Sequence, residues 1–504
     1  MPAPPPREEY AVTRLELVQL GRRPLERFEP VVGRERFRKG LGIAERMRRH
    51  FAGRVVWNIN STARGGGVAE MLRYLIAYAR GAGVDARWLV IEGTPEFFHL
   101  TKRLHNALHG EFGDGSPLGE EQRAIYEEVM RNNAAELLAE VAPEDIVILH
   151  DPQTAGLIPH LANLGAGVVW RCHIGADESN EEVERGWAFL APYLADADRF
   201  VFSRQAYVPD YCDHGRAKII PPSIDPFSPK NQELDEETVH SILVHTGLVE
   251  GPNGQARTFI RDDGAPGRVE HRADVVRLGR APLWAVPLVV QVSRWDRLKD
   301  PTGVMRGFER LVEGGDPSGA HLVMAGPNVK AVADDPEGAE VFGEVEAEWR
   351  KLPHAVRDRI HLASLPMHDI EENAAIVNAL QRHATVLVQK SLREGFGLTV
   401  TEAMWKAKPV IGSAVGGIQD QIVHGQSGLL LDDPRDEEGF ARLLHEVLSD
   451  PDRARALGDA AKERVRENYL GLSSLIEFGT LILGIDEQRR GRRSEGARES
   501  APSS

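Results

Sequence analysis

Cysteine is scarce in this 504-residue sequence, which contains only Cys172 and Cys212. Two cysteines cannot supply a disulfide framework or a metal knuckle, so we expect a reducing, cytoplasmic environment. Long apolar runs are also lacking: no window approaches about 18 uninterrupted apolar residues, and no membrane span is expected. Met1 to Glu9 is rich in proline and charge, without the apolar core of a signal peptide.

An excess of positive charge is lacking as well, since 76 acidic residues outnumber 61 basic ones and the formal charge is −15. This balance argues against general affinity for nucleic acid or anionic membranes, while local basic sites for phosphate stay open. A hydrophobic content of 42% and a charged content of 27% are typical of a soluble globular enzyme. The chain is too long for one compact core, so two domains are expected.

Short apolar runs alternate with helix-like stretches in both halves of the chain, which predicts mainly parallel sheets covered on both faces. In the first half the predicted strands are 54–60, 86–91, 146–149, 168–172, 199–202 and 218–220. In the second half they are 287–293, 321–325, 359–362, 385–388, 409–411 and 428–431. We therefore predict an α/β fold of two doubly wound, Rossmann-like domains facing a central cleft.

The predicted domain boundaries follow from where this alternation stops and restarts. Residues 1–228 form the N-terminal domain and residues 287–470 the C-terminal domain. The polar stretch 229–286 is predicted to be an insertion or linker, in which residues 258–260 and 269–278 could form a small hairpin. A closing helix at 470–486 is expected to pack back on the N-terminal domain, and the Arg- and Ser-rich residues 487–504 are expected to be disordered.

Three consecutive glycines, Gly65, Gly66 and Gly67, follow the first strand and precede a helix. Glycines let the backbone approach a ligand closely, and the start of the helix offers free N–H groups to an anion. The spacing matches neither a dinucleotide fingerprint nor a P-loop. The motif is therefore either a ligand-binding loop or only a tight turn.

A basic turn, 293–301, follows the first strand of the second domain, on the side where open α/β sheets bind ligands. Its Arg294 and Lys299 could converge on a diphosphate, Arg as a planar fork and Lys as a compact charge. The alternative is an ordinary solvated turn.

The stretch 393–404 carries two carboxylates, Glu394 and Glu402, around a Gly-Phe-Gly sequence that leads into a helix. On one continuous helix they would lie about 12 Å apart along the axis, too far for a close acid/base pair. With Glu394 on the preceding loop, they could instead contact opposite ends of one ligand. A nucleotide sugar, with hydroxyls at both ends and charge between, fits this arrangement.

Polar residues also end two neighbouring strands of the first domain: His150 and Asp151 end one, and His173 the next. Taken alone, each histidine could equally have a structural or solvated role. Because polar residues end two neighbouring strands, a ligand-binding site at this edge of the sheet is favoured. Asp196 and Asp198 have the D-x-D spacing of some metal sites. They lie before a strand, at the edge away from ligands, so no metal site is predicted.

The sequence resembles retaining glycosyltransferase family 4, a family with the GT-B architecture of two Rossmann domains. Further motifs lie at 91–98, 101–102, 104–110, 170–174, 221–226 and 393–406. These motifs resemble those of the trehalose glycosyltransferring synthases within the family.

The resemblance implies a reversible, retaining transfer of glucose from a nucleoside diphosphate glucose to glucose, giving trehalose. The N-terminal domain would bind the acceptor and the C-terminal domain the donor, without a required cofactor, although magnesium could stimulate the reaction. The implied catalytic residues are His173, Arg294, Lys299 and Glu394. Implied donor-binding residues are Gly65, Gly66, Gly67, Arg294, Lys299, Glu394, Gly395, Phe396, Gly397, Leu398 and Glu402. Those for the acceptor are Asp151, His173 and Asn60.

The sequence departs from the family pattern in two places. The family has His-Ile-Asp where this chain has His173-Ile174-Gly175, and segment 245–284 is longer than the family's connector. Both departures concern the acceptor more than the donor. A retaining trehalose phosphorylase, a family 4 enzyme with another acceptor and a catalytically silent nucleotide-sugar-binding protein remain as alternatives. By resemblance, a homodimer is expected, without nucleic acid or membrane partners.

Overall fold

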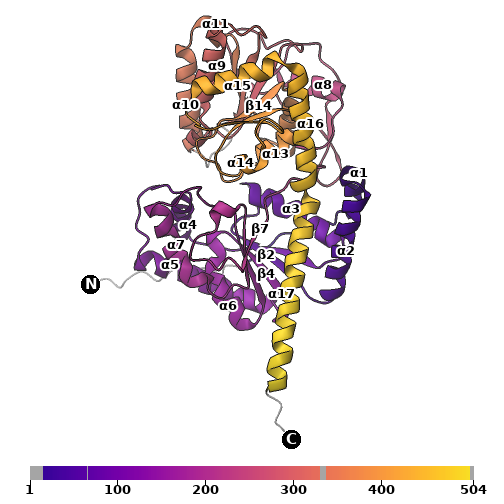
Figure 1. The fold of residues 1–504 in the computed structure, drawn as a ribbon, viewed down its shortest axis with the longest axis vertical. Helices are drawn as coiled ribbons and strands as arrows, with labels where there is room; N and C mark the ends of the chain where they lie inside the picture. Colours follow the sequence, from indigo (N-terminus) through magenta and orange to yellow (C-terminus); the bar gives the residue numbers. More distant parts are fainter. Residues whose placement is uncertain (1–14, 65, 330–335, 500–504) are drawn as a thin grey trace, which may run out of the picture. The chain divides into compact units, whose positions relative to one another are not determined.

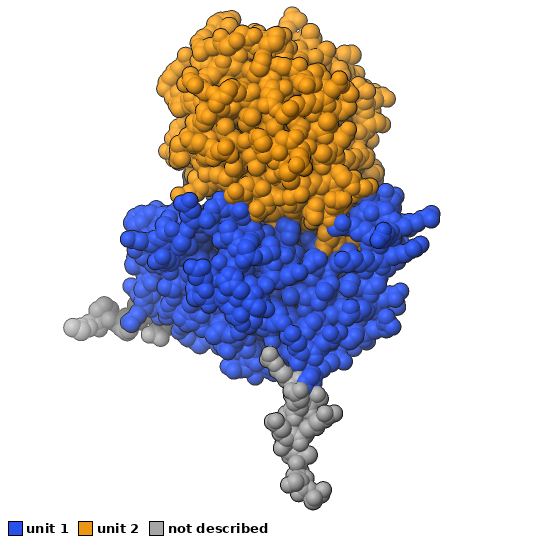
Figure 2. Space-filling model, in the orientation of Figure 1, with its two compact units in different colours: residues 1–221, 474–504 blue, residues 222–473 orange. Residues whose placement is uncertain are grey.

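The computed structural model describes residues 15–64, 66–329 and 336–499 (Figure 1). The chain divides into two compact units, which Figure 2 shows in different colours. Unit 1 comprises residues 1–221 and 474–504, and unit 2 comprises residues 222–473. Each unit contains one seven-stranded sheet. The prediction of an α/β fold with two Rossmann-like, parallel-sheet domains is confirmed.

The unit 1 sheet is parallel except at one edge, where β1 pairs antiparallel with β3. Its five-residue strands β2 and β4 are buried along their whole length, as expected for central strands covered on both faces. The strands in spatial order are β1 (Glu16–Leu17), β3 (Ala86–Val90), β2 (Val56–Asn60), β4 (Ile146–His150), β5 (Gly167–Cys172), β6 (Arg199–Phe202) and β7 (Ala217–Ile219).

Two groups of helices cover the faces of this sheet (Figure 1). Side-chain caps fix where two of them begin, because Thr94 accepts from the N–H of Phe97, and Asn180 accepts from those of Glu182 and Val183. One face carries α4 (Pro95–Leu108), α5 (Glu120–Glu140), α6 (Ile158–Leu164) and α7 (Glu181–Leu194). The other carries α2 (Arg34–His50) and α17 (Gly471–Glu499).

Helix α17 extends further than expected, since residues 487–499 are helical instead of forming a disordered tail. Ion pairs anchor α17 on the rest of unit 1 near this point: Arg489 lies 2.8 Å from Asp198, and Asp486, just before it, lies 2.8 Å from Arg54. Arg489 also donates to the carbonyl of Gly165 at 2.6 Å. The composition suggested a solvated tail because these partners are distant in sequence. Residues 500–504 lie outside the described part.

The unit 2 sheet has the strand order of a dinucleotide-binding fold, again with one antiparallel strand at an edge. The strands in spatial order are β10 (Asp274–Val276), β13 (Ile360–Leu365), β12 (His321–Pro327), β11 (Leu288–Val292), β14 (Val386–Gln389), β15 (Val410–Ser413) and β16 (Leu429–Leu431). Its longer helices are α9 (Pro301–Glu313), α10 (Pro336–Lys351), α12 (Ile370–His383), α13 (Leu398–Trp405), α15 (Glu437–Ser449) and α16 (Pro451–Asn468).

The stretch 229–286, predicted as an insertion or linker, is an integral part of unit 2. Helix α8 (Glu236–Thr246) packs against α12, and β10 completes the main sheet. The predicted pairing of 258–260 with 269–278 is wrong: β8 (Thr258–Ile260) forms a hairpin with β9 (Pro266–Arg268), and residues 274–276 pair with β13. Strands β8, β9 and β10 are only three residues long, which is too short for a clear alternation of apolar and polar residues.

The strand order of each sheet marks where a ligand is expected. In unit 1, β2 is followed in sequence by a strand on one side and then by β4 on the other, so the order reverses between β2 and β4. In unit 2 the reversal lies between β11 and β14. Open α/β sheets bind ligands beyond the carboxyl ends of the strands at such switch points.

Candidate functional site

The predicted donor residues of unit 2 follow the two strands that flank its switch point. Arg294 and Lys299 come after β11, and Glu394 comes after β14. The Nζ of Lys299 lies 2.5 Å from Oε2 of Glu394, and both side chains are largely buried. The hydroxyl of Ser391 donates to the same carboxylate oxygen at 3.3 Å. The structure therefore brings together two of the residues predicted from separate motifs.

Arg294 lies in the same turn but differs in exposure from Lys299. Its side chain is 66% exposed, and its guanidinium lies 3.0 Å from the carboxylate of Asp296. Asp296 also accepts from the N–H of Leu298 at 2.8 Å, which fixes the start of the short 3-10 helix Arg297–Lys299. Arg294 thus presents a fork of donors to solvent from an ordered turn.

The loop from Glu394 to Leu398 ends at a helix start, as the sequence predicts. Gly397 has a φ of +83°, which favours glycine, and it precedes α13 without a side-chain cap. No side chain caps the N–H groups of the first helical turn, which is typical of an anion-binding position, and the N–H of Val400 donates to the carbonyl of Gly397 at 2.9 Å. From the other side, the amide of Gln421 donates to the carbonyls of Phe396 and Gly397 at 2.6 and 3.3 Å and holds the loop.

Gly417 supports the same loop from the turn after β15. Its N–H donates to the carbonyl of Gly395 at 3.1 Å, and an added Cβ would lie 2.7 Å from Cα of Phe396. We expect Gly417→Ala to lower the free energy of unfolding by about 1–3 kcal/mol, because backbone atoms would have to move. Denaturant unfolding would measure this effect, with Gly343→Ala, where an added Cβ meets nothing within 4 Å, as the control. Equal stability of both variants would contradict the prediction.

Glu402 is buried on α13, and two lysines that were not predicted from the sequence contact it. Its carboxylate lies 3.3 Å from Nζ of Lys230, and its backbone carbonyl accepts from Lys406 at 3.1 Å. Lys406 also donates to Asn231, and burial lowers the pKa of its ammonium to about 7. Lys230 belongs to the stretch that was predicted to be a linker, so no sequence signal pointed to it.

A second unpredicted pair, Lys390 and Asp300, lies behind the loop. Lys390 is buried directly after β14, and its ammonium contacts the carboxylate of Asp300. Asp300 has a φ of +47°, and its carboxylate accepts from the N–H of Gly303 at the start of α9. A non-glycine residue in this conformation is uncommon and marks an ordered, strained turn. The pair therefore connects the turn after β11 to the end of β14.

In unit 1 the glycine loop lies at the carboxyl end of β2, as predicted. Gly66 has a φ of +77° and begins α3 (Gly66–Gly81), which includes Gly67, while Gly65 lies outside the described residues. Asn60, predicted to bind the acceptor, donates to the carbonyl of Thr62 at 2.7 Å and accepts from Trp88 at 2.8 Å. Its amide therefore also braces the loop.

Asp151 and His173 meet at the carboxyl ends of β4 and β5. The carboxylate of Asp151 accepts from the backbone N–H of His173 at 2.7 Å. Asp151 has a φ of +64°, and its carbonyl accepts from the indole of Trp170 at 3.1 Å. Burial raises the pKa of its carboxyl to about 7, although the hydrogen bond from His173 acts in the opposite sense. The two predicted acceptor residues are thus in direct contact.

His150 connects His173 to the sheet. Its Nδ1 lies 3.2 Å from Nε2 of His173, and its Nε2 lies 3.2 Å from the Oδ1 of Asn58. Burial, followed by the nearby charge of Arg171, lowers the pKa of His150 to about 3 and also lowers that of His173, so both rings are neutral near pH 7. Because the Asn58 oxygen accepts, His150 carries its proton on Nε2, and its Nδ1 accepts from Nε2–H of His173.

The shifted pKa values of His150 and Asp151 predict that these two groups change the stability in opposite directions as the pH falls. The unfolded pKa of His150, about 6.5, exceeds its folded value of about 3. Its contribution to stability is therefore lost as the pH falls below about 6.5. Asp151 has a folded pKa of about 7, above its unfolded value of about 3.9, so its contribution falls as the pH rises through that interval.

We expect His150→Gln to make the loss of stability between pH 6.5 and pH 4 shallower, and Asp151→Asn to make it steeper. Denaturant unfolding at several pH values would measure both slopes relative to the unsubstituted protein. Because the readout is a slope, a uniform loss of stability in either variant does not affect it. Slopes that change in the same direction would contradict the assignment.

The described residues show neither a metal-ligand cluster nor a membrane-spanning helix. Within residues 15–64, 66–329 and 336–499 no group of three His, Cys, Asp or Glu side chains is arranged to hold a metal ion. In the same residues no helix is long and apolar enough to cross a membrane. The Asp198 carboxylate, part of the D-x-D spacing, directly precedes β6 and accepts from the N–H of Val168 in β5 at 2.9 Å.

Two family models match the chain: "Trehalose synthase, N-terminal domain" over residues 58–209 and "Glycosyl transferases group 1" over residues 285–464. With the two Rossmann-like units, they identify the chain as a glycosyltransferase of GT-B fold. A trehalose synthase from Pyrococcus horikoshii is 37% identical over 450 residues, which are 89% of this chain and 94% of that protein. The chain therefore belongs to the trehalose synthase family.

Further relatives extend the comparison. A trehalose synthase from Rubrobacter xylanophilus is 36% identical and covers 90% of this chain and 95% of its own length. A trehalose phosphorylase from Pleurotus pulmonarius is 27% identical over 88% of this chain and 58% of its own length. The solved structure of an α,α-trehalose 6-phosphate synthase from Burkholderia multivorans superposes with a TM-score of 0.62 at 17% identity, covering 90% of this chain and 99% of that one. This last similarity supports the fold alone.

Proposed function

We propose that the chain transfers glucose, with retention, from a nucleoside diphosphate glucose to the anomeric hydroxyl of a second glucose, and so forms α,α-trehalose. The observation that carries this proposal is the contact of Lys299 with Glu394 beside the uncapped start of α13. This cluster lies at the switch point of the unit 2 sheet in a member of the trehalose synthase family. We propose that the reaction is reversible.

Unit 2 would bind the donor. Arg294, Lys299 and the backbone N–H groups of residues 395–398 would contact the diphosphate. Glu394, held by Lys299, would accept hydrogen bonds from the glucose hydroxyls, and Glu402 would accept them from the ribose. Negative charge grows on the diphosphate as its bond to the sugar breaks. Fixed cations and dipoles therefore stabilise the transition state more than the ground state.

Unit 1 would bind the acceptor through Asp151, His173 and Asn60. The bond from C1 of glucose to the phosphate oxygen breaks as a bond from C1 to the acceptor oxygen forms on the same face. The acceptor proton passes to the departing phosphate oxygen. Neutral His173, whose Nε2–H is directed to His150, would orient the sugar and not attack it. Because side chains neutralise the diphosphate, this mechanism needs no metal ion, and magnesium would only stimulate it.

A retaining trehalose phosphorylase is the second candidate, supported by the Pleurotus pulmonarius relative. It would use inorganic phosphate in place of the nucleoside diphosphate, and the same cationic groups would serve it. The two activities differ in the substrate required for trehalose cleavage.

One set of incubations tests both candidates. The protein is given free glucose with ADP-, UDP- or GDP-glucose, and the product is identified by its anomeric NMR signals. In parallel it is given trehalose with each nucleoside diphosphate or with inorganic phosphate. Trehalose formed only with a nucleotide donor supports the synthase. Cleavage with phosphate and no synthesis from any nucleotide sugar would overturn it in favour of the phosphorylase.

A further inference from the structure

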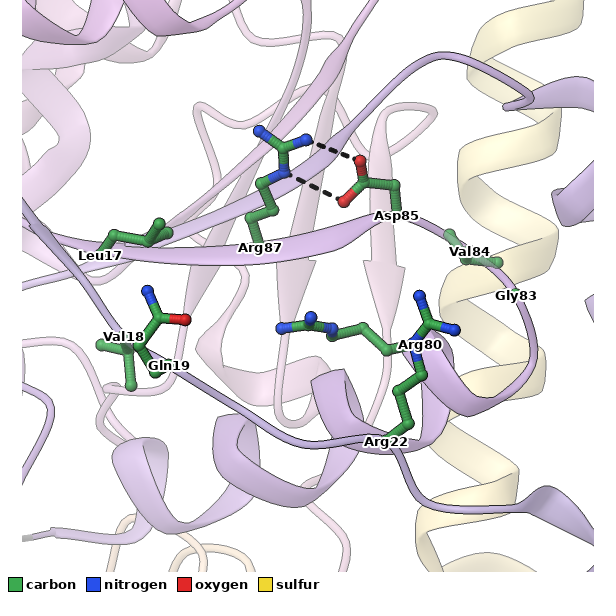
Figure 3. A pocket seen from close by; sticks show the side chains of 9 residues that line it. All are labelled: Leu17, Val18, Gln19, Arg22, Arg80, Gly83, Val84, Asp85 and Arg87. Atoms are coloured by element: carbon green, nitrogen blue, oxygen red, sulfur yellow. Dashed lines mark hydrogen bonds and ion pairs between the residues drawn. The ribbon is translucent and has the colours of Figure 1, made fainter.

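A hollow lies in unit 1, in a part of the sequence that no motif singled out. Its volume is about 420 Å³, and it is lined by the segment 17–22 and by the turn from the end of α3 to the start of β3 (Figure 3). It lies beside Ala86, at the amino end of β3, whereas Asn60 and Val90 pair at the carboxyl ends of β2 and β3. It is therefore separate from the groups proposed to bind the acceptor.

The wall of this hollow is a short arch of backbone. The N–H of Val18 donates to the carbonyl of Trp88, and that of Arg23 donates to Ala77, both at 2.9 Å. The residues between these anchors bridge strand β3 and helix α3. A Cβ at Gly81 would lie 1.8 Å from the carbonyl oxygen of Arg23, so the arch closes onto the helix end only because residue 81 is glycine.

Three arginines line the hollow against one carboxylate. Arg87 pairs with Asp85 through two bonds of 3.0 and 2.8 Å, and Figure 3 shows Arg80 extending into the space beneath them. The side chains of Arg22 and Arg80 have no hydrogen bond or ion pair with any residue of the described part. The hollow thus holds a local surplus of positive charge on a chain whose formal charge is −15.

Glu140 and Asp145 also act on Arg87 from a distance, and the hydrogen-bond donors to Asp145 are neutral groups, so its negative charge remains. Its carboxylate accepts from the N–H groups of Val55 and Ala142 and from the indole of Trp57. The side chain of Arg48 passes close to Gly83 on the wall, since its Cδ would lie 3.0 Å from a Cβ added there. The carboxylates of Asp85, Asp145 and Glu140 thus offset part of this positive charge, whereas the side chains of Arg22 and Arg80 form no ion pair within the described residues.

We propose that this hollow, the arginine pocket, binds a small phosphate ester of sugar-phosphate size. Arginine forks match the oxygens of a phosphate, and several of them provide more than one charge-assisted contact. A volume of about 420 Å³ is within the range of small-molecule sites, roughly 300–1,000 Å³. The acidic chain as a whole disfavours nucleic acid.

The test is a calorimetric titration of the full-length protein with sorbitol 6-phosphate. This probe carries a phosphate ester but no anomeric centre, so it cannot serve as the acceptor in the proposed reaction. Sorbitol and inorganic phosphate are titrated in parallel. We expect sorbitol 6-phosphate to bind with a Kd below about 1 mM, phosphate to bind more weakly and sorbitol not at all.

Substitutions that are expected to change the affinity in opposite directions test whether the probe binds in the arginine pocket. Arg22→Ala with Arg80→Ala should weaken it by about tenfold or more, because two charge-assisted contacts are lost. Asp85→Asn should tighten it, because Arg87 loses the carboxylate that competes with the ligand. A merely unfolded protein would not bind more tightly. The matched control, Arg34→Ala with Arg38→Ala, removes the same charge from α2 in unit 1 and should leave the affinity unchanged.

Several results would overturn the proposal. These are no heat from sorbitol 6-phosphate at millimolar concentration, or equal affinity for inorganic phosphate, or binding that survives the double substitution in the pocket. Binding lost in Arg294→Ala would also overturn it, because the probe would then occupy the proposed donor site. The readout is affinity and not turnover, so it stands apart from the test of the proposed function.

Discussion

Replacing Arg294 by alanine is expected to lower kcat by about 10²- to 10³-fold while the protein stays folded. The reason for the lost activity is that its guanidinium would face the diphosphate as negative charge develops there. The fold should be retained because the Arg294 side chain is 66% exposed and its ion partner is Asp296 at 3.0 Å. Exposed pairs of this kind contribute about 0–1 kcal/mol to stability.

The matched control is Arg280→Ala, which removes an arginine that is 87% exposed in the same unit and pairs with Glu250. Steady-state rates of trehalose formation and thermal unfolding would be measured for both variants. Near-normal kcat in Arg294→Ala would contradict its role. A large loss in both variants would indicate that net charge, and not the position of Arg294, matters.

Restoring the family's aspartate at position 175 is expected to destabilise unit 1 by about 3 kcal/mol. A Cβ at Gly175 would lie 2.1 Å from Cγ of the Tyr207 ring, so the side chains cannot coexist without movement. Tyr207 is buried and therefore cannot swing easily into solvent. The departure from the family pattern thus has a steric cause in this chain, the tyrosine that occupies the place of a side chain at residue 175.

The test of this cause is a double substitution. Gly175→Asp alone should lower the free energy of unfolding, whereas Gly175→Asp combined with Tyr207→Ala should lose less than the sum of the two single effects. Denaturant unfolding of the three variants measures the coupling. Strictly additive losses would show that Tyr207 is not what excludes a side chain at position 175.

Most of the sheet structure could be predicted because its strands are short, continuous apolar runs. β4 and β5 are buried at every residue, and each was predicted within one residue of its ends. Helix α2 was not predicted, because only Phe37, Gly40 and Met47 are buried among its 17 residues. β10 was also missed as part of the sheet, since a three-residue edge strand carries almost no periodic signal.

Residues of the candidate site could be predicted where they come soon after a predicted strand. Lys299 and Glu394 were both selected from local motifs, and the strand order of unit 2 explains why they meet. Lys230 and Lys390 were not selected, because their carboxylate partners, Glu402 and Asp300, are distant in sequence. Long-range ion pairs depend on the packed fold, and a lone lysine in the sequence does not reveal its partner.

The return of α17 to unit 1 has a consequence for the order in which the chain is synthesised. Ile482, Leu483 and Ile485 of this helix belong to the apolar cluster over one face of the first sheet. All of unit 2, residues 222–473, must leave the ribosome before they do. At about 5–20 residues per second, that interval lasts roughly 13 to 50 s. A nascent chain therefore lacks one of the helices that cover this apolar sheet face until late in its translation, which favours binding by a chaperone.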